Sequence, residues 1–439
     1  MKTRTAGLAA ALLMVFATST YAQAPVEPPA PATPATVLKA AHLFDGRSGT
    51  LVSPGLVVVQ GGRILGVGPN AAIPAGAKVM DLGNATLLPG YIDAHTHIAY
   101  DHDDDWAQGF YEGMLRFPVE QSFHAARNAR LALASGVTSA RDLGAGDFID
   151  VALRNAINGG LTEGPRMFVA GHALGSTGGH CDSSPFPPER VTPSGPLEGV
   201  CNGPEECRLA TRLQMKYGAD VIKICASGGV LSESDPVDVP QLTPAELTAI
   251  VSEAHAWGRK VAAHSHGDVA ARQAVEAGVD SIEHGSFLQP ATLQLMKQKG
   301  VYLVPTRLAL VWTVAHADGY PAKIAAKARA AGASHDRMFK DAMRIGTPIA
   351  FGTDSAVSPH GINAQEFGDM VDVGMTPAAA LLTSSQGSAK LLGIEGETGT
   401  LEAGKFADIV AVPGDVLQDI RATEKPVLVM KQGVVVLEN

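Results

Sequence analysis

The histidines of this sequence include two pairs of the form His-x-His. His95 and His97 end the apolar run LLPGYIDAHTH, and His264 and His266 end the run VAAHSH. Alternate residues of a β-strand point to the same side, so each pair could place two imidazoles on one metal ion. A chain of 439 residues with 14 histidines is expected to contain such a pair by chance. The pairs therefore indicate a metal site only if other ligands accompany them.

A lysine, Lys223, interrupts the apolar and β-branched run VIKIC. A buried ammonium group is costly unless it is paired, so one interpretation is an edge lysine whose charged end reaches solvent. The other interpretation is that burial lowers the pKa of Lys223 and makes its amine nucleophilic. Such an amine can react with carbon dioxide to give a carbamate, and the two carbamate oxygens can bridge two divalent cations.

Two more apolar runs end in side chains that bind metals, because His284 ends VDSIEH and Asp354 follows TPIAFGT. Taken singly, a strand histidine is more often a hydrogen-bonded core residue, and an aspartate in GTD is usually a turn or cap residue. The joint pattern is poorly explained by chance, since six metal-capable side chains end five separate runs. We predict two divalent cations about 3.5 Å apart, bridged by the carboxylated lysine and a water. The six predicted ligands are His95, His97, Lys223, His264, His284 and Asp354.

These residues need a scaffold that brings the ends of separate strands together. Between residues 90 and 392, eight short apolar runs alternate with helical patterns, one of which opens with a capping box from Thr243 to Glu246. This alternation predicts an α/β fold, a (β/α)8 TIM barrel, whose active sites lie at the carboxyl ends of the strands. Helical periods mark residues 203–217, 243–258, 268–277 and 376–392. The predicted strands end at His95, Leu143, Gly171, Cys225, His264, His284, Pro305 and Thr353.

Both ends of the chain differ from the middle. Residues 37–89 and 393–439 consist of β-branched runs broken by Gly and Asp, and they predict a small β-sandwich domain formed by both chain ends. Residues 1–22 have a basic start, an apolar stretch and small residues before Gln23, which is the pattern of a signal peptide. Residues 23–36 are rich in Pro and Ala and predict a linker. We therefore expect an exported protein, periplasmic or secreted.

The composition narrows the classes of partner and predicts the state of the cysteines. A formal net charge of -10 argues against nucleic acid, and no run after the signal segment is long enough for a membrane helix. Export permits disulfides, and Cys201 and Cys207 flank a short turn across which they could pair. Cys225 lies in an apolar run, which predicts a buried free thiol.

In the same order along the chain, several segments resemble the amidohydrolase superfamily: LFDG, LLPGYIDAHTH, VIKIC, VAAHSHG, SIEHG, AFGTD and GTLEAGKFADIVAV. The stretch ALGSTGGH, which ends at His180, and the stretch SGGVLS after Lys223 resemble its branch of binuclear-metal peptidases and amidases. That branch includes Xaa-Pro dipeptidases and ochratoxin-hydrolysing enzymes. The resemblance covers nearly the whole chain after the signal segment.

The resemblance implies which of the predicted ligands would bind each cation. His95, His97 and Asp354 would bind one cation, His264 and His284 would bind the other, and the carboxylated lysine would bridge both. A mixed nitrogen and oxygen ligand set suits zinc and tolerates manganese or cobalt. Zinc is therefore the expected metal.

The predicted chemistry is hydrolysis of an amide by a hydroxide that bridges the two metals. Asp354 would take the proton of the attacking water and return it to the leaving nitrogen, which an amide requires. His180 follows a glycine-rich stretch and is the candidate for stabilising the oxyanion; the alternative is a loop histidine without a role. His266 would line the pocket, and the acidic run from Asp101 to Asp105 would form a solvated rim. The resemblance implies a small-molecule substrate, a dipeptide or N-acyl amino acid, with ochratoxin-type amides included.

Three other functions fit the same fold. A mononuclear-metal deaminase would need no bridging lysine, so Lys223 argues against it. A lactonase or phosphotriesterase would use the same hydroxide on another bond. A non-enzymatic assembly protein usually loses its metal ligands, whereas the full ligand set is present here. The resemblance allows a homo-oligomer, but no coiled-coil pattern or other pairing signal specifies one.

Overall fold

The structure is a computed structural model that describes residues 34–182, 187, 189–190, 192–233 and 235–438. The predicted signal peptide and all but the last three residues of the predicted linker lie outside these residues. Residues 34–439 form a single unit by their contacts, so the domain boundaries predicted near residues 89 and 392 stay predictions.

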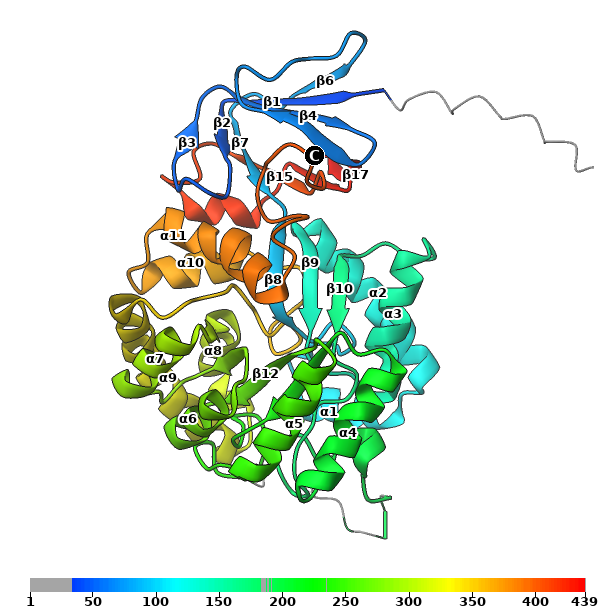
Figure 1. The fold of residues 1–439 in the computed structure, drawn as a ribbon, viewed down its shortest axis with the longest axis vertical. Helices are drawn as coiled ribbons and strands as arrows, with labels where there is room; N and C mark the ends of the chain where they lie inside the picture. Colours follow the sequence, from blue (N-terminus) through cyan, green and yellow to red (C-terminus); the bar gives the residue numbers. More distant parts are fainter. Residues whose placement is uncertain (1–33, 183–186, 188, 191, 234, 439) are drawn as a thin grey trace, which may run out of the picture. The chain divides into compact units, whose positions relative to one another are not determined.

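Strands from both ends of the chain pair with one another (Figure 1). One sheet has the order β5-β4-β1-β6, and a second has the order β17-β16-β15-β7-β2-β3, in which the C-terminal strand β15 pairs antiparallel with the N-terminal strand β7. One hydrophobic cluster contains residues of both sheets, among them Val57, Leu87 and Ile409. The strands are β1 (Thr36–Ala40), β2 (His42–Phe44), β3 (Leu51–Val52), β4 (Gly55–Gln60), β5 (Arg63–Val67), β6 (Lys78–Asp81), β7 (Ala85–Pro89), β15 (Ile409–Pro413), β16 (Leu428–Lys431) and β17 (Val434–Glu438).

Among the described residues, seven parallel strands occupy the middle of the chain and form two sheets, ordered β10-β9-β8 and β11-β12-β13-β14. Nearly all of their residues are buried, as expected for parallel strands that helices cover. The strands are β8 (Tyr91–Thr96), β9 (Val137–Asp142), β10 (Arg166–Val169), β11 (Val221–Cys225), β12 (Lys260–Ser265), β13 (Ser281–His284) and β14 (Tyr302–Val304).

Isolated parallel bridges connect these two sheets. Leu174 after β10 pairs with Ile224 of β11, and Leu303 of β14 pairs with Ile349. The backbone N–H of Ala94 in β8 also donates to the carbonyl of Phe351 at 2.9 Å. The eighth strand predicted to end at Thr353 is thus a segment of bridges rather than a regular strand. The described parallel strands thus form two sheets, of three and of four strands, and isolated bridges adjoin both sheets.

Helices follow most of the parallel strands and pack around them, as α4 and α5 do in Figure 1. The predicted capping box is confirmed, because Thr243 Oγ1 accepts from the Glu246 N–H at 3.3 Å and Glu246 Oε2 accepts from the Thr243 N–H at 2.7 Å. Among the described residues, every helix is too short or too polar to cross a bilayer. The α-helices are α1 (Trp106–Leu115), α2 (Pro118–Ala134), α3 (Ile149–Asn158), α4 (Pro204–Tyr217), α5 (Pro244–Ala256), α6 (Asp268–Ala277), α7 (Pro290–Lys299), α8 (Arg307–Ala315), α9 (Ala322–Ile345), α10 (Gln365–Asp372), α11 (Pro377–Leu382) and α12 (Ala389–Leu392). The short helical turns are η1 (Gly146–Phe148), η2 (Pro196–Glu198), η3 (Ala317–Gly319), the π-helical η4 (Thr383–Ser388) and η5 (Ile420–Glu424).

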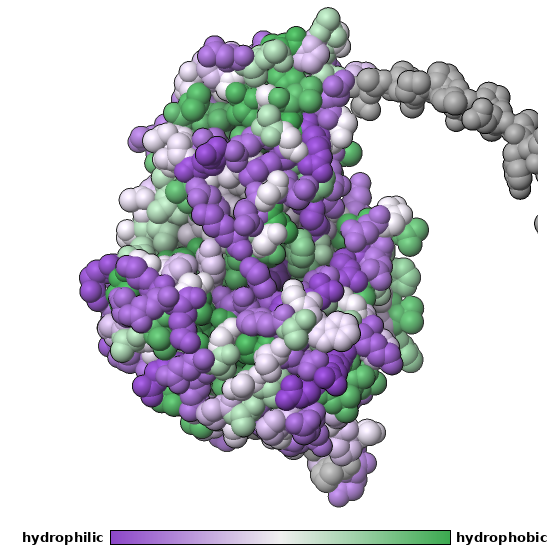
Figure 2. Space-filling model, viewed as in Figure 1, coloured by the Kyte–Doolittle hydropathy of each residue, from purple (hydrophilic) through white to green (hydrophobic). Residues whose placement is uncertain are grey.

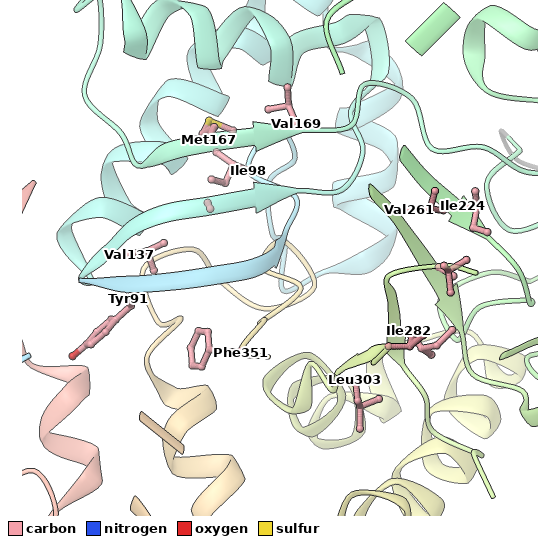
Figure 3. Close-up of a cluster of buried hydrophobic side chains, with 14 of the residues drawn as sticks. Tyr91, Ile98, Val137, Met167, Val169, Ile224, Val261, Ile282, Leu303 and Phe351 are labelled. Atoms are coloured by element: carbon pink, nitrogen blue, oxygen red, sulfur yellow. The ribbon is translucent and has the colours of Figure 1, made fainter. Parts of the chain in front are cut away.

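The largest hydrophobic cluster lies between the parallel strands and their helices. Figure 3 shows side chains from the strands, such as Val169, Val261 and Ile282, in this cluster. On the face drawn in Figure 2 polar side chains predominate, and apolar ones also gather along the edge formed by α2 and α3. The strands are therefore held rigidly by packing, which leaves their carboxyl ends free to carry polar side chains.

The four cysteines form two disulfides. Cys201 and Cys207 pair as their spacing permits. Cys181 pairs with Cys225, with Cα atoms 5.8 Å apart, so the prediction that Cys225 is a free thiol was wrong. Cys225 is buried as predicted, but the loop that carries Cys181 returns to the end of β11 and supplies a partner. The apolar setting of a cysteine indicates burial and does not exclude a bridge.

Candidate metal centre

All six predicted ligands lie on or just beyond the carboxyl ends of the parallel strands. His95 is in β8 and His97 follows it, Lys223 is in β11, His264 is in β12, His284 ends β13, and Asp354 follows the bridge segment. The register of β11, β12 and β13 sets Cys225 beside His264 and Ser265 beside His284. Hydrogen bonding between neighbouring strands therefore aligns residues that are far apart in sequence.

Asp354 lies close to both His95 of β8 and His97, which follows that strand. Its Oδ1 lies 3.2 Å from His95 Nε2 and 3.4 Å from His97 Nε2. Lys223 Nζ lies 3.3 Å from His95 Nε2. The sequence thus predicted correctly that these four side chains come together, although whether each binds a metal stays a prediction.

The other two predicted ligands complete the cluster. The rings of His264 and His284 are 4.7 Å apart between centroids, and the ring of His284 is 5.0 Å from that of His95. Two triplets of potential ligand atoms each lie within 4.8 Å of one another: one from His95, His284 and Asp354, the other from His264, His266 and His284. His284 belongs to both triplets and so links the two halves of the centre.

Two residues that the sequence analysis missed hold His95. Its Nδ1 donates to Glu283 Oε2 at 2.8 Å, and Glu283 Oε1 lies 3.0 Å from the guanidinium of Arg141. All three side chains are at most 3% exposed. Burial opposes ionisation of Glu283, but Arg141 and His95 outweigh it and lower its pKa to about 2. Glu283 therefore directs Nε2 of His95 toward the centre, as carboxylates do for metal-binding histidines.

An outer partner also engages one ring nitrogen of each remaining histidine ligand. These partners fix the tautomer, because each accepts a hydrogen bond from a ring N–H: Gly144 O from His97 Nδ1 at 3.2 Å, Gly228 O from His264 Nε2 at 3.2 Å, and Thr306 Oγ1 from His284 Nδ1 at 2.7 Å. The Thr306 hydroxyl can accept this hydrogen bond because its own O–H donates to the Pro305 carbonyl. The opposite nitrogen of each ring remains for ligation.

Burial keeps the imidazoles of His97, His264 and His284 neutral. It lowers the pKa of His97 to about 3 and holds the pKa values of His264 and His284 well below the ordinary value. A neutral imidazole is the form that binds a metal ion. These three histidines are therefore in the protonation state that metal binding requires at neutral pH.

The pKa values of Lys223 and Asp354 are both lowered, but for different reasons. Burial lowers the pKa of Lys223 to about 8, although Glu283 and Asp354 oppose the shift. Burial alone would raise the pKa of Asp354, but the charge and hydrogen bonding of His95 outweigh it and hold the pKa below its ordinary value. The centre thus combines an ionised carboxylate with an amine that is easily deprotonated. Such a donor set fits divalent cations that accept both nitrogen and oxygen ligands.

Three residues of the centre have left-handed backbone conformations. The φ angle is 68° at His284, 56° at Asp354 and 47° at Thr306. Each such conformation costs about 1 to 3 kcal/mol in a residue other than glycine and persists only where the surroundings fix it. The outer hydrogen bond between His284 and Thr306 joins two of the three. Strain of this kind is concentrated at functional sites.

His180 lies beside the second triplet. Its ring stacks on His264 with centroids 4.4 Å apart, and its backbone N–H donates to Gln241 Oε1 at 2.8 Å. Burial lowers its pKa to about 4, and among the described residues its buried Nδ1 has no hydrogen-bond partner. A Cβ at Gly229 would lie 2.0 Å from Cε1 of this ring, so the close approach requires glycine. His180 is therefore held against the centre by a loop that admits no side chain.

The centre opens into a cavity of about 210 Å³ lined by His97, His180, Lys223, His264, His266, His284 and Asp354. His266, predicted as pocket lining, does line it; its Nδ1 lies 2.9 Å from Ser286 Oγ, and the ring also falls within reach of a metal held by His264 and His284.

Among the described residues, Asp93 makes no hydrogen bond to the ring of a predicted ligand. Its carboxylate accepts from the backbone N–H and the hydroxyl of Thr353, at 3.1 and 2.7 Å, and so positions the residue before Asp354.

Comparisons of sequence and of structure show which known proteins the chain resembles. The model of the Amidohydrolase family matches residues 86–436. Ochratoxinase of Aspergillus niger is 35% identical over 413 residues, which cover 89% of this chain and 84% of that protein. Its crystal structure has a TM-score of 0.82 at 32% identity, covering 93% of this chain and 96% of that chain.

Two further solved structures are similar over nearly their whole length. One is a Xaa-Pro dipeptidase with bound methionine in its active site, with a TM-score of 0.87, 36% identity, and coverage of 91% of this chain and 99% of that chain. The other is a prolidase complexed with N-methylphosphonate-L-proline, with a TM-score of 0.83, 29% identity, and coverage of 92% and 100%.

Proposed function

The chain belongs to the amidohydrolase family, and from this premise we propose that it is a metal-dependent hydrolase of an amide or peptide bond. The observation that carries the proposal is the position of Lys223. Its amine is buried, lies 3.3 Å from His95 Nε2 and has a pKa lowered to about 8 by that burial. A buried amine with a lowered pKa is more readily deprotonated and nucleophilic, as carbamate formation requires.

We assign the six predicted ligands to two divalent cations, with zinc expected. Lys223 gains CO2 at Nζ and loses a proton, which gives a carbamate with two oxygen donors. When bound, the cations supply Lewis acidity: they lower the pKa of water and polarise the carbonyl of the substrate. The outer partners Glu283, Gly144, Gly228 and Thr306 hold the four imidazoles in the orientation that this assignment needs.

The proton transfers are assigned to Asp354. Its carboxylate, 13% exposed at the edge of the cavity, accepts the proton of the attacking water and delivers it to the nitrogen of the scissile amide. His180 is neutral and lines the cavity, and among the described residues its Nδ1 has no hydrogen-bond partner. We assign this ring to donate to the oxygen on which negative charge develops.

The substrate class rests on the relatives. The Xaa-Pro dipeptidase holds methionine, a free amino acid, and the prolidase holds a proline derivative. We therefore assign a dipeptide or N-acyl amino acid with a free α-carboxylate. Amides of the ochratoxin type are included because ochratoxinase is 35% identical.

Three further assignments rest on sequence patterns and on the bridges. The bridge segment near Ile349 would complete a closed (β/α)8 ring, with the terminal sheets as a β-sandwich. Residues 1–22 would direct export to the periplasm or medium. The enzyme would act on a small molecule, and a homo-oligomer is compatible with the family.

The proposal is tested by incubating the purified zinc-loaded protein with N-acetyl-L-phenylalanine and a panel of dipeptides. Release of the free amino acid is followed by mass spectrometry, with Asp354→Asn as the matched inactive control. Cleavage by the wild type and its loss in the variant support the assignment. Release of ammonia from aminopurines without cleavage of any amide would contradict it and would favour the deaminase.

A further inference from the structure

A second cavity, of about 670 Å³, opens beside the metal centre. We call it the α1 chamber, because α1 forms much of its wall. The chamber and the metal cavity share two lining residues, Leu231 and Val357. A substrate whose amide lies at Asp354 can therefore extend past these two side chains into the chamber. The chamber is several times larger than the metal cavity and exceeds what a small acyl group would fill.

Aromatic side chains line the α1 chamber. Trp106 and Phe110, on one face of α1, stack with centroids 5.6 Å apart and planes 7° from parallel. Tyr100 and Tyr320 face the same space. Tyr100 is 44% exposed and Phe110 is 41% exposed, and none of the residues of α1 is buried. Large rings left this exposed inside a cavity would gain from covering by another apolar surface.

Tyr100 connects the chamber to the metal centre. Its hydroxyl accepts from the Gly146 N–H at 2.9 Å, and its ring centroid lies 6.3 Å from that of His97. The N-terminus of α1 is fixed as well, because Asp105 caps it by accepting from the Ala107 N–H at 3.0 Å. The chamber wall is thus a defined surface rather than a chance opening.

The charge of the chamber decides which part of a substrate fits. Its charged lining, among the described residues, consists of four carboxylates, those of Asp101, Asp103, Glu112 and Asp147, against the guanidinium of Arg116. Arg116 is already paired with Asp101 at 2.8 Å. A free α-carboxylate is therefore disfavoured here. The leaving amino acid, which carries that carboxylate, must lie elsewhere, and the acyl side of the substrate remains for the chamber.

We propose that the α1 chamber is the acyl-side specificity site of the enzyme and selects a large aromatic acyl group that is neutral or positively charged. The inference rests on the proposed amide hydrolysis. Stacking on Trp106 and Phe110 supplies the preference for a ring, and the carboxylates reject an acidic acyl group.

The test compares kcat/KM for three substrates that share one leaving amino acid: N-(2-naphthoyl)-, N-acetyl- and N-succinyl-L-phenylalanine. The wild type should prefer the naphthoyl over the acetyl substrate by at least about tenfold. Trp106→Ala should lower that ratio about tenfold, and Trp106→Phe, which keeps a ring, should lower it less. Asp103→Asn should raise the ratio of succinyl to acetyl about threefold.

The matched control is Trp257→Ala, since Trp257 is 65% exposed at the end of α5 and does not line the chamber. It should leave the naphthoyl preference at the wild-type value, and metal content should equal that of the wild type in every variant. A wild-type ratio near one, or equal losses from Trp106→Ala and Trp257→Ala, would overturn the inference while leaving amide hydrolysis intact. Cleavage of none of the three substrates, or of other amides, by the fully metal-loaded wild type would instead overturn the proposed function and the inference with it.

Discussion

Glu283 accepts a hydrogen bond from Nδ1 of His95 at 2.8 Å, although 188 positions separate the two residues. Both side chains are fully buried. Arg141 lies on the other side of Glu283 at 3.0 Å and offsets its charge. The three residues come from β8, β9 and β13, and only β8 and β9 pair with each other. Their side chains form a chain of hydrogen bonds that ends at the metal-facing ring of His95. This chain gives a physical reason why that ring has a single orientation.

Replacing Glu283 by Gln should weaken metal binding by about 10- to 100-fold, because an amide offers His95 Nδ1–H a weaker acceptor and leaves Arg141 uncompensated. Metal affinity is measured by competition with a chromogenic chelator. The matched control is Glu402→Gln, which breaks the more exposed ion pair with Arg47 and should leave affinity unchanged. An unchanged affinity in Glu283→Gln would show that the buried chain does not act on the metal.

Replacing His180 by Ala should lower kcat about 100- to 1,000-fold if this residue stabilises the oxyanion. Metal content should remain that of the wild type, since His180 is not among the six assigned ligands. Steady-state kinetics together with metal analysis separate the two effects. A loss of metal along with activity would make His180 a ligand, and full activity would make it a loop residue without a catalytic role.

The variant Gly229→Ala tests the role of His180 by placing a methyl group against its ring. The added Cβ would lie 2.0 Å from the imidazole of His180, which is stacked on His264. The ring must therefore be displaced, and kcat should fall with metal content retained. Gly258→Ala is a suitable control, since a Cβ there would meet nothing within 4 Å, although its positive φ costs some stability. Normal kcat in Gly229→Ala would mean that the position of His180 is unimportant.

Removing the metal should abolish hydrolysis and lower the melting temperature by roughly 5 °C, because ions that bind only the folded state stabilise it. Without ions, the buried carboxylate and the imidazoles of the centre lose their main partner. Calorimetry before and after dialysis against a chelator measures the shift. Zinc with bicarbonate should restore both properties, whereas a chelator-resistant activity would contradict the metal mechanism.

The two disulfides should contribute unequally to stability. Cys181–Cys225 closes 44 positions of chain and should stabilise by about 4 kcal/mol, whereas Cys201–Cys207 closes 6 and should stabilise by about 2 kcal/mol. Double Ser variants of each pair, unfolded in guanidinium chloride, provide the comparison. The first bridge also ties the residue after His180 to the strand of Lys223, so its loss should reduce kcat as well. Equal stabilities of the two variants would contradict the loop-length argument.

The positions of the six candidate ligands could be predicted from the sequence because each is a polar side chain at the end of a short apolar run or inside one. His95 and His284 are found where the hydrophobic residues stop, and Lys223 where a charge interrupts VIKIC. Parallel strands bring such positions together. The eighth run, before Asp354, was recognised in the same way, but it forms bridges and not a regular strand. The left-handed backbone at Asp354 breaks the regular pattern there.

The residues that orient the ligands could not be predicted. Glu283 precedes His284 in sequence, yet it serves His95, and only the register of distant strands reveals this. Its one signal was a carboxylate inside an apolar run, which required a buried cation such as Arg141. The partner of Cys225 was missed for a similar reason, because a loop of unpredictable path delivers Cys181. The aromatic chamber likewise depends on how α1, an exposed helix, lies over the site.

The most direct test of the account is the metal content of the wild type beside Lys223→Ala, each reconstituted with zinc and bicarbonate and assayed with N-acetyl-L-phenylalanine. If carboxylated Lys223 bridges two cations, the wild type should hold about two metal ions per chain, and Lys223→Ala should lose amide cleavage. About one ion per chain, with cleavage intact in Lys223→Ala, would contradict the bridging carbamate and would favour a mononuclear enzyme such as the deaminase.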